Sequence, residues 1–149
     1  MSVGIGRFGP DDRPRWTELW RAYLEFYETT LPDAVYDHTW SRLQTDRALH
    51  AFAARSNGQI IGLTHFLYHE SAWTQAPVCY LQDLFVDPSA RAGGVGRALI
   101  EAVAADARTR SCPRLFWLTQ DHNTTARLLY DRIAKHNGFL RYDYDLGSL

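Results

Sequence analysis

The sequence has few cysteines, no long apolar run and almost no net charge. Cys79 and Cys112 are its two cysteines, and their spacing gives neither a disulfide framework nor paired metal ligands. No apolar run approaches the roughly 20 residues of a membrane helix, and we see no signal peptide at the N-terminus. The formal net charge is −1, so no overall basic field attracts nucleic acid or anionic lipid. These absences predict a cytoplasmic protein with no nucleic-acid or membrane partner.

The length and composition are typical of one globular domain. The chain has 149 residues, of which 46% are hydrophobic, 13% aromatic and 22% charged. A chain of this size buries about 69% of its extended surface, which is enough for a core without disulfides or metal. We therefore expect a single domain over residues 1–149.

The apolar side chains change their period along the chain. Asp11 and Asp12, with Pro14 just after, indicate a helix start, and apolar side chains follow at helical spacing from Trp16 to Tyr27. Helices are also expected over residues 34–44, 96–110 and 124–136. Strands are expected over residues 3–8, 48–55, 59–69, 77–86, 114–120 and 139–146, and Asn57-Gly58 is typical of a tight hairpin turn. This order predicts an α+β fold, an α/β mixed sheet with helices packed on it.

A glycine-rich turn joins the strand expected at 77–86 to the helix expected at 96–110. Glycines let a backbone approach a ligand, and the free N–H groups and dipole of a helix start attract anions. The turn therefore predicts a phosphate or pyrophosphate site, with Arg91 and Arg97 adding positive charge. Arg97-Ala98 stands where a P-loop has Lys-Ser/Thr, and Leu99 where a dinucleotide fingerprint has its third glycine, so neither motif matches.

Arg91-Ala92-Gly93-Gly94-Val95-Gly96 resembles the Arg/Gln-x-x-Gly-x-Gly/Ala signature of the GNAT (Gcn5-related N-acetyltransferase) superfamily. Residues 123–130 resemble the family's Asn-x-x-Ala-x-x-x-Tyr segment, and Gly138-Phe139 its step into the next strand. Residues 80–86 look closest to the branch of polyamine and histone acetyltransferase-like proteins. The resemblance implies the GNAT acyl-CoA N-acyltransferase fold, a mostly antiparallel mixed sheet with a V-shaped opening and flanking helices.

The resemblance also implies the reaction, transfer of an acetyl group from acetyl-CoA to a primary amine, with no metal. The pyrophosphate would lie on the amides of the turn and the pantetheine along the preceding strand. Tyr130 is implied as the general acid to the CoA thiolate, and Asn123 as a helix cap or a cofactor contact. The residues assigned to acetyl-CoA are Leu84, Phe85, Val86, Arg91, Ala92, Gly93, Gly94, Val95, Gly96, Arg97, Asn123 and Tyr130.

The general base is left open by the sequence. Polyamine enzymes usually have Leu-Glu-Asp where this chain has Leu81-Gln82-Asp83, and Gln82 can hydrogen-bond to an acceptor but cannot take its proton. Asp83 is a candidate base, and its alternative is a structural hydrogen bond. His65 and His69 share one strand face without an identifiable third metal ligand, so we expect them to pack across strands.

The acceptor is expected to be a small cationic amine, a polyamine or an amino-acid-like amine. Tyr27 and Glu28 belong to an acidic, aromatic segment suited to such a cation, although a solvated helix face explains them too. The alternatives are a protein lysine or N-terminal acetyltransferase and a non-catalytic CoA-binding module. Only one strand is expected after the last helix, where many GNAT chains have two, so we predict a homodimer in which these edge strands meet.

Overall fold

The computed structural model describes residues 2–147, which divide between Leu118 and Thr119 into two separately compact units. The elements of the first unit are β1 (Gly4–Gly6), η1 (Pro10–Asp12), α1 (Arg13–Phe26), α2 (Asp33–Thr45), β2 (His50–Ser56), β3 (Gln59–His69), β4 (Val78–Val86), η2 (Pro88–Ala90), α3 (Val95–Thr109) and β5 (Leu115–Phe116). The second unit holds α4 (Thr124–Ile133).

The sheet has the order β1-β2-β3-β4-β5 and is antiparallel as far as β4, whereas β5 lies parallel to β4. Asn57 and Gly58 close the β2–β3 hairpin with φ values of 52° and 76°. Positive φ at both turn residues matches the right-handed twist of the strands, which is why an Asn-Gly pair stands there. The expected mostly antiparallel mixed sheet is confirmed.

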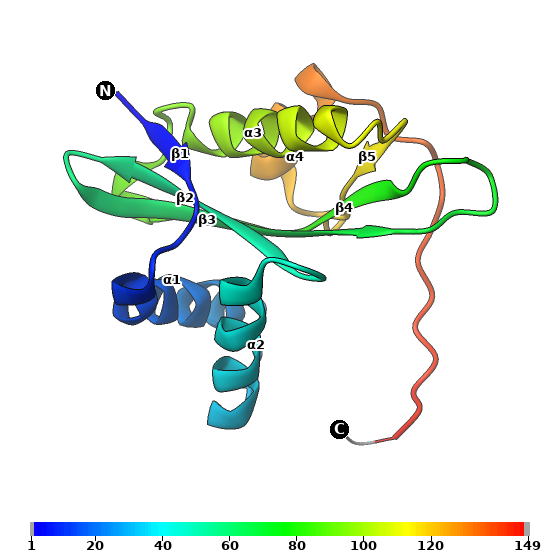
Figure 1. Ribbon diagram of the computed structural model, residues 1–149. Coiled ribbons are helices and arrows are strands. Elements are labelled where there is room, and N and C mark those ends of the chain that lie inside the picture. Colours follow the sequence, from blue (N-terminus) through cyan, green and yellow to red (C-terminus); the bar gives the residue numbers. More distant parts are fainter. Residues whose placement is uncertain (1, 148–149) are drawn as a thin grey trace. The chain divides into compact units, whose positions relative to one another are not determined.

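Helices cover both faces of this sheet (Figure 1). α1 and α2 lie on one face, where Trp16, Trp20 and Trp40 pack with Leu63 and Phe85 in a large apolar core. α3 lies on the other face, and its core there includes Ala54, Val95, Leu99, Leu84 and Val86. Neighbouring side chains of β4 therefore alternate between two different cores, as the pleat of a strand requires.

One edge of β4 is open along most of its length. β5 pairs with β4 only at Cys79 and Tyr80, and the described residues place no other strand on this edge. The strand expected over residues 114–120 is thus much shorter, because the chain leaves the ladder after Phe116. The backbone of β4 from Leu81 to Val86 has one edge free of strand pairing within the described chain.

The second unit differs from the expectation at its C-terminal end. α4 ends at Ile133, because Ala134 takes an extended backbone with φ of −148°. The strand expected over residues 139–146 is wrong for the described chain, in which this segment has no ladder partner. Its alternating apolar side chains are 77–92% exposed: Leu140, Tyr142, Tyr144 and Leu146. An alternating pattern fits a strand, but a strand also needs a neighbouring backbone to bond.

Candidate active site

The glycine-rich turn, where the sequence predicts an anion site, leads directly into the N-terminus of α3. Gly94 is the residue before α3 and takes φ of 76°, with no atom within 4 Å of the position where a Cβ would lie. The first hydrogen bond of the helix runs from the Ala98 N–H to the Gly94 carbonyl. The amides of Val95, Gly96 and Arg97 precede it, and such amides have no partner within their own helix.

Both arginines of the turn are held by protein groups. Arg91 Nε donates to the Val86 carbonyl at 3.1 Å, and its guanidinium lies 5.5 Å from the Phe85 ring centre. Arg97 Nε donates to Glu101 at 2.9 Å, in a pair in which both side chains are more than half exposed. An exposed pair at this helical spacing contributes only about 0.5 kcal/mol, so Glu101 holds Arg97 weakly.

A β-bulge interrupts the pairing of β4 with β3. His65 faces Asp83 and Phe66 faces Leu81, which leaves Gln82 as the extra residue. Gln82 is exposed, whereas Asp83 is buried with 8% exposure. Bulges re-aim side chains and often lie beside active sites. The bulge separates the two candidate residues into one at the surface and one in the interior.

Asp83 belongs to a line of hydrogen-bonded side chains between α1 and the sheet. The Trp16 indole N–H donates to His65 Nε2 at 3.0 Å, and His65 Nδ1 lies 3.0 Å from Asp83 Oδ2. Tyr23 lies close enough to Asp83 and Tyr27 for both residues to contribute to its raised pKa. Burial, with Asp83 beside the ring, raises the pKa of Tyr23 far above its usual range, so the phenol keeps its proton. We call Trp16, His65 and Asp83, together with the neighbouring Tyr23, the Asp83 line.

Sequence reasoning missed the hydrogen bonds of His65. It expected packing across strands, and His65 and Asp83 are indeed cross-strand neighbours, but they are also hydrogen-bonded. The alternation of the strand could have indicated these bonds. His65 follows the buried Leu63 by two residues and so lies on the same face, and a buried imidazole needs polar partners. His69 is exposed. No group of three metal-ligating side chains occurs among residues 2–147.

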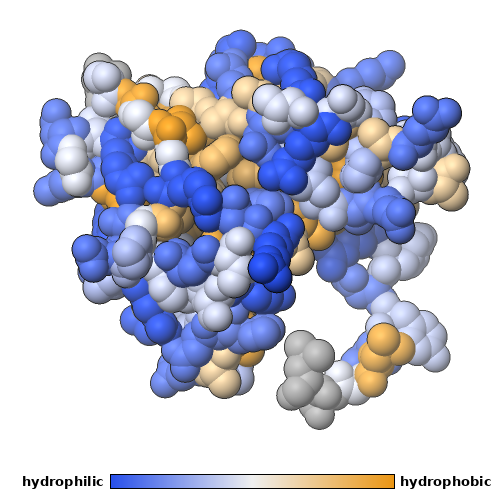
Figure 2. Space-filling view, viewed as in Figure 1, coloured by the Kyte–Doolittle hydropathy of each residue, from blue (hydrophilic) through white to orange (hydrophobic). Residues whose placement is uncertain are grey.

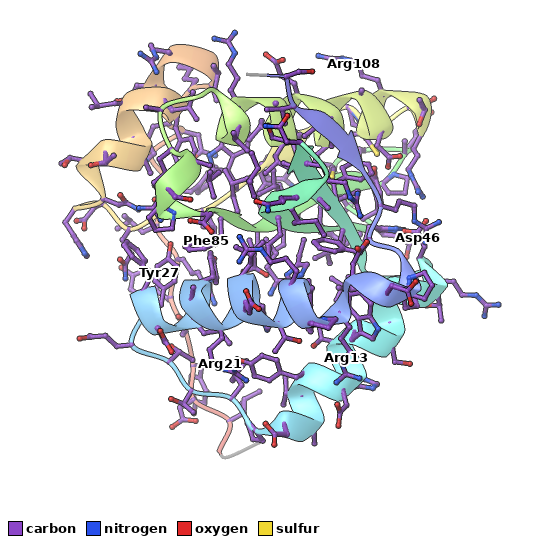
Figure 3. The ribbon with its side chains drawn as sticks, turned by 90° about the vertical axis from the view of Figure 1, so that its left-hand side faces the viewer. Arg13, Arg21, Tyr27, Asp46, Phe85 and Arg108 are labelled. Carbon is purple, nitrogen blue, oxygen red and sulfur yellow. The ribbon has the colours of Figure 1, made fainter. Side chains whose placement is uncertain are left out.

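The expected acceptor residues lie at the C-terminal end of α1. The Tyr27 ring centre is 5.0 Å from that of Tyr23, which in turn lies 6.2 Å from Phe85. Figure 3 shows Tyr27 and Phe85 at the same end of the α1 face. Glu28 is exposed, with φ of 53°. Much of the surface that α1 and α2 present in Figure 2 is hydrophilic. The structure therefore brings Tyr27 to the Asp83 line and leaves Glu28 at the surface.

The second unit carries the remaining predicted residues. The Asn123 side chain accepts a hydrogen bond from the Ala126 N–H at 3.3 Å and so caps α4. Tyr130 is half-buried on the same helix, in a stripe with Leu129 and Ile133. A contact of Asn123 with the cofactor, and the acid role of Tyr130, stay predictions.

Comparisons with known proteins agree on one family. The sequence profile described as "Acetyltransferase (GNAT) family" matches residues 14–134. The D-amino-acid N-acetyltransferase HPA3 of Saccharomyces cerevisiae is 34% identical over 142 residues, which cover 87% of this chain and 88% of the yeast protein. The thialysine N-epsilon-acetyltransferase of Caenorhabditis elegans is 31% identical over 116 residues, 72% of each chain.

Solved structures share the fold. A ribosomal-protein-alanine N-acetyltransferase from Brucella melitensis superimposes with a TM-score of 0.82 at 24% identity, covering 98% of this chain and all of the other. The aminoglycoside N-acetyltransferase AAC(6′)-Iy, in complex with a bisubstrate analogue, gives a TM-score of 0.84 at 19% identity, covering 97% and 99%. Within residues 2–147, no helix is both long and apolar enough to cross a lipid bilayer.

Proposed function

The chain belongs to the GNAT acetyltransferase family and is an N-acetyltransferase, and from this premise we propose that it acetylates a small cationic amine with acetyl-CoA. The observation that carries the proposal is Asp83, a buried carboxylate on a strand with an open edge, connected to the aromatic end of α1. The names of the yeast and nematode relatives favour an amino-acid-like acceptor over a polyamine.

The donor side consists mainly of backbone. The amides after Gly94 suit the pyrophosphate of acetyl-CoA, and the open edge of β4 at Leu84, Phe85 and Val86 suits the amides of pantetheine. The positive φ of Gly94 supports this fit, because a glycine takes this backbone without strain and leaves the adjacent amides uncovered by a side chain. The residues 91–97 of the turn are thus proposed as the pyrophosphate site.

The part of the site that binds the amine supplies negative charge and a base. Tyr27, Glu28 and the exposed Gln82 would contact the cationic amine, and Asp83 would take one proton from it. The amine lone pair then forms a C–N bond with the acetyl carbon, and the C–S bond breaks. Tyr130 would protonate the departing thiolate, the second amine proton would restore the Tyr130 hydroxyl, and Asp83 would release its proton to solvent. One amide, free CoA and one proton are the balanced products.

Other parts of the proposal concern the whole chain. The family match at 14–134 runs through both compact units, which favours one GNAT domain over residues 1–149.

The exposed alternating segment after Gly138 favours a homodimer in which this segment pairs with a second copy. The free thiols of Cys79 and Cys112 suit a reducing, cytoplasmic setting.

An acceptor screen tests the proposal. The protein is incubated with acetyl-CoA and a panel of D-amino acids, L-amino acids, polyamines, aminoglycosides and lysine peptides, and thiol release is followed. We expect turnover with a small amine and none with the peptides alone. Turnover restricted to peptides would replace the acceptor class, and binding of acetyl-CoA without any turnover would indicate the non-catalytic module.

A further inference from the structure

We propose that His65 and Trp16 are positioning residues for Asp83, which fix its carboxylate for proton transfer from the acceptor amine. This proposal rests on the proposed function above, in which Asp83 is the base. It concerns two residues that do not touch the substrates, one on β3 and one on α1. The carrying observation is that the indole, imidazole and carboxylate form one hydrogen-bonded series in the interior.

The indole determines which nitrogen of His65 carries the hydrogen. Trp16 can only donate, so His65 Nε2 must offer its lone pair to the indole N–H. The hydrogen of the neutral ring is then on Nδ1, which donates to Asp83 Oδ2. A second proton on the imidazole would break the bond to Trp16. The pair therefore keeps its negative charge on Asp83, where a base needs it.

The hydrogen bonds also explain how a carboxylate remains in this interior. Trp16 is 0% exposed, His65 is 1% exposed and Asp83 is 8% exposed. An unpaired buried charge is costly, and hydrogen bonds to it offset that cost. His65 supplies such a bond, with its Nδ1 3.0 Å from Asp83 Oδ2. The small exposed part of Asp83 is left for the acceptor.

A second imidazole–carboxylate pair, His50 with Asp46, lies outside the candidate site and serves as a comparison for His65 and Asp83. His50, on β2, is 3% exposed, and its Nδ1 lies 2.6 Å from Asp46 Oδ1 just after α2. Figure 3 shows Asp46 at the opposite end of the α1 face from Tyr27 and Phe85. Loss of either histidine removes the bond between a buried imidazole and a carboxylate, which is buried for Asp83 and partly exposed for Asp46. Only His65 is bonded to a residue of the candidate site.

The test compares His65→Leu, His65→Asn and His50→Leu with the wild type. Kinetics use acetyl-CoA and the best amine from the screen, and urea unfolding measures stability. We expect His65→Leu to lower kcat by about 10- to 100-fold, the range seen when a group that orients a functional side chain is removed. The KM for acetyl-CoA should stay unchanged. His65→Asn should restore most of kcat, because its amide N–H can occupy the place of Nδ1. His50→Leu should lose stability with kcat retained.

A second readout is independent of turnover. Nitrogen NMR of the histidine rings should show His65 as a neutral Nδ1–H ring in the wild type, and a changed tautomer balance in Trp16→Phe. Equal kcat in His65→Leu and the wild type, or an Nε2–H ring at His65, would overturn the positioning role alone. Absence of turnover by the wild type with every amine would overturn the proposed function, and this proposal with it.

Discussion

The two faces of β4 differ in chemistry although they belong to the same short strand. On the α3 face, Leu84 and Val86 pack against an apolar core that contains the first buried residue of the glycine turn, Val95. On the α1 face, Asp83 is hydrogen-bonded to His65 and lies among aromatic rings. Beside the α3 face, the open edge of β4 and the turn before α3 offer mainly backbone groups to a ligand, whereas the α1 face offers side chains.

Under the proposed function, this difference means that the two substrates are recognised in different ways. A donor bound by amides and an open strand edge is recognised through backbone geometry, which many sequences can provide. An acceptor bound beside Asp83 and Tyr27 is recognised through particular side chains, which vary between relatives of one fold. Changes on the α3 side should therefore act on acetyl-CoA binding, and changes on the α1 side on kcat and the acceptor.

The largest effect is expected from Gly94→Glu. A side chain at φ of 76° is strained, and its carboxylate would repel the pyrophosphate. We expect the Kd of acetyl-CoA, measured by calorimetry, to rise by about 100-fold or more, which is about 2.7 kcal/mol. Gly94→Ala is the control for backbone strain without charge. Unchanged affinity in Gly94→Glu would remove the turn from the donor site.

The next largest effect is expected from Asp83→Asn. The amide keeps the size of the side chain but takes no proton, so kcat should fall by about 100-fold or more. The Kd of acetyl-CoA should be unchanged, since the turn lies on the other face. A variant with full kcat would show that Asp83 has only a structural role.

A smaller effect is expected from Tyr130→Phe. A thiol ionises near pH ~8.5, so a CoA thiolate is a fair leaving group even without a proton donor. We expect kcat to fall by about tenfold, because acid catalysis helps this step less than base catalysis helps the amine. The KM for acetyl-CoA should change little. A raised KM with kcat retained would make Tyr130 a binding residue instead.

The smallest effect is expected from Asp87→Asn and concerns the free energy of unfolding. This change removes the ion pair between Arg15 of α1 and Asp87, which follows β4. Asp87 accepts the Ser89 N–H at 2.9 Å and Arg15 Nη2 at 2.7 Å, and these bonds lower the pKa of Asp87 from its usual 3.8 to about 2. Because the folded-state pKa is lowered, its stabilisation is complete above pH 3.8 and is lost as the pH falls towards 2. Urea unfolding of the wild type and Asp87→Asn should differ at pH 6 and converge near pH 2. A constant difference would contradict this assignment.

The main helices and strands of the first unit could be predicted from the sequence, because the patterns that indicate them are local. The Asn57-Gly58 turn, the stripe of α3 and the glycines before it each depend on neighbouring residues. The Asp83 line joins residues of α1, β3 and β4, and no local pattern records that Trp16 faces His65. The segment after Gly138 has a clear local alternation of apolar residues, yet it forms no strand within the described chain. Strand formation needs a neighbouring backbone, which a local pattern does not specify.

The bulge at Gln82 has a consequence for how this enzyme can change over evolution. A residue that is extra to the ladder and exposed has few packing constraints, so its side chain can be exchanged at little cost to folding. Its neighbour Asp83 is fixed by the interior. Under the proposed function, new acceptor preferences would therefore arise at this one tolerant position beside Asp83, while the proposed base and donor site stay unchanged.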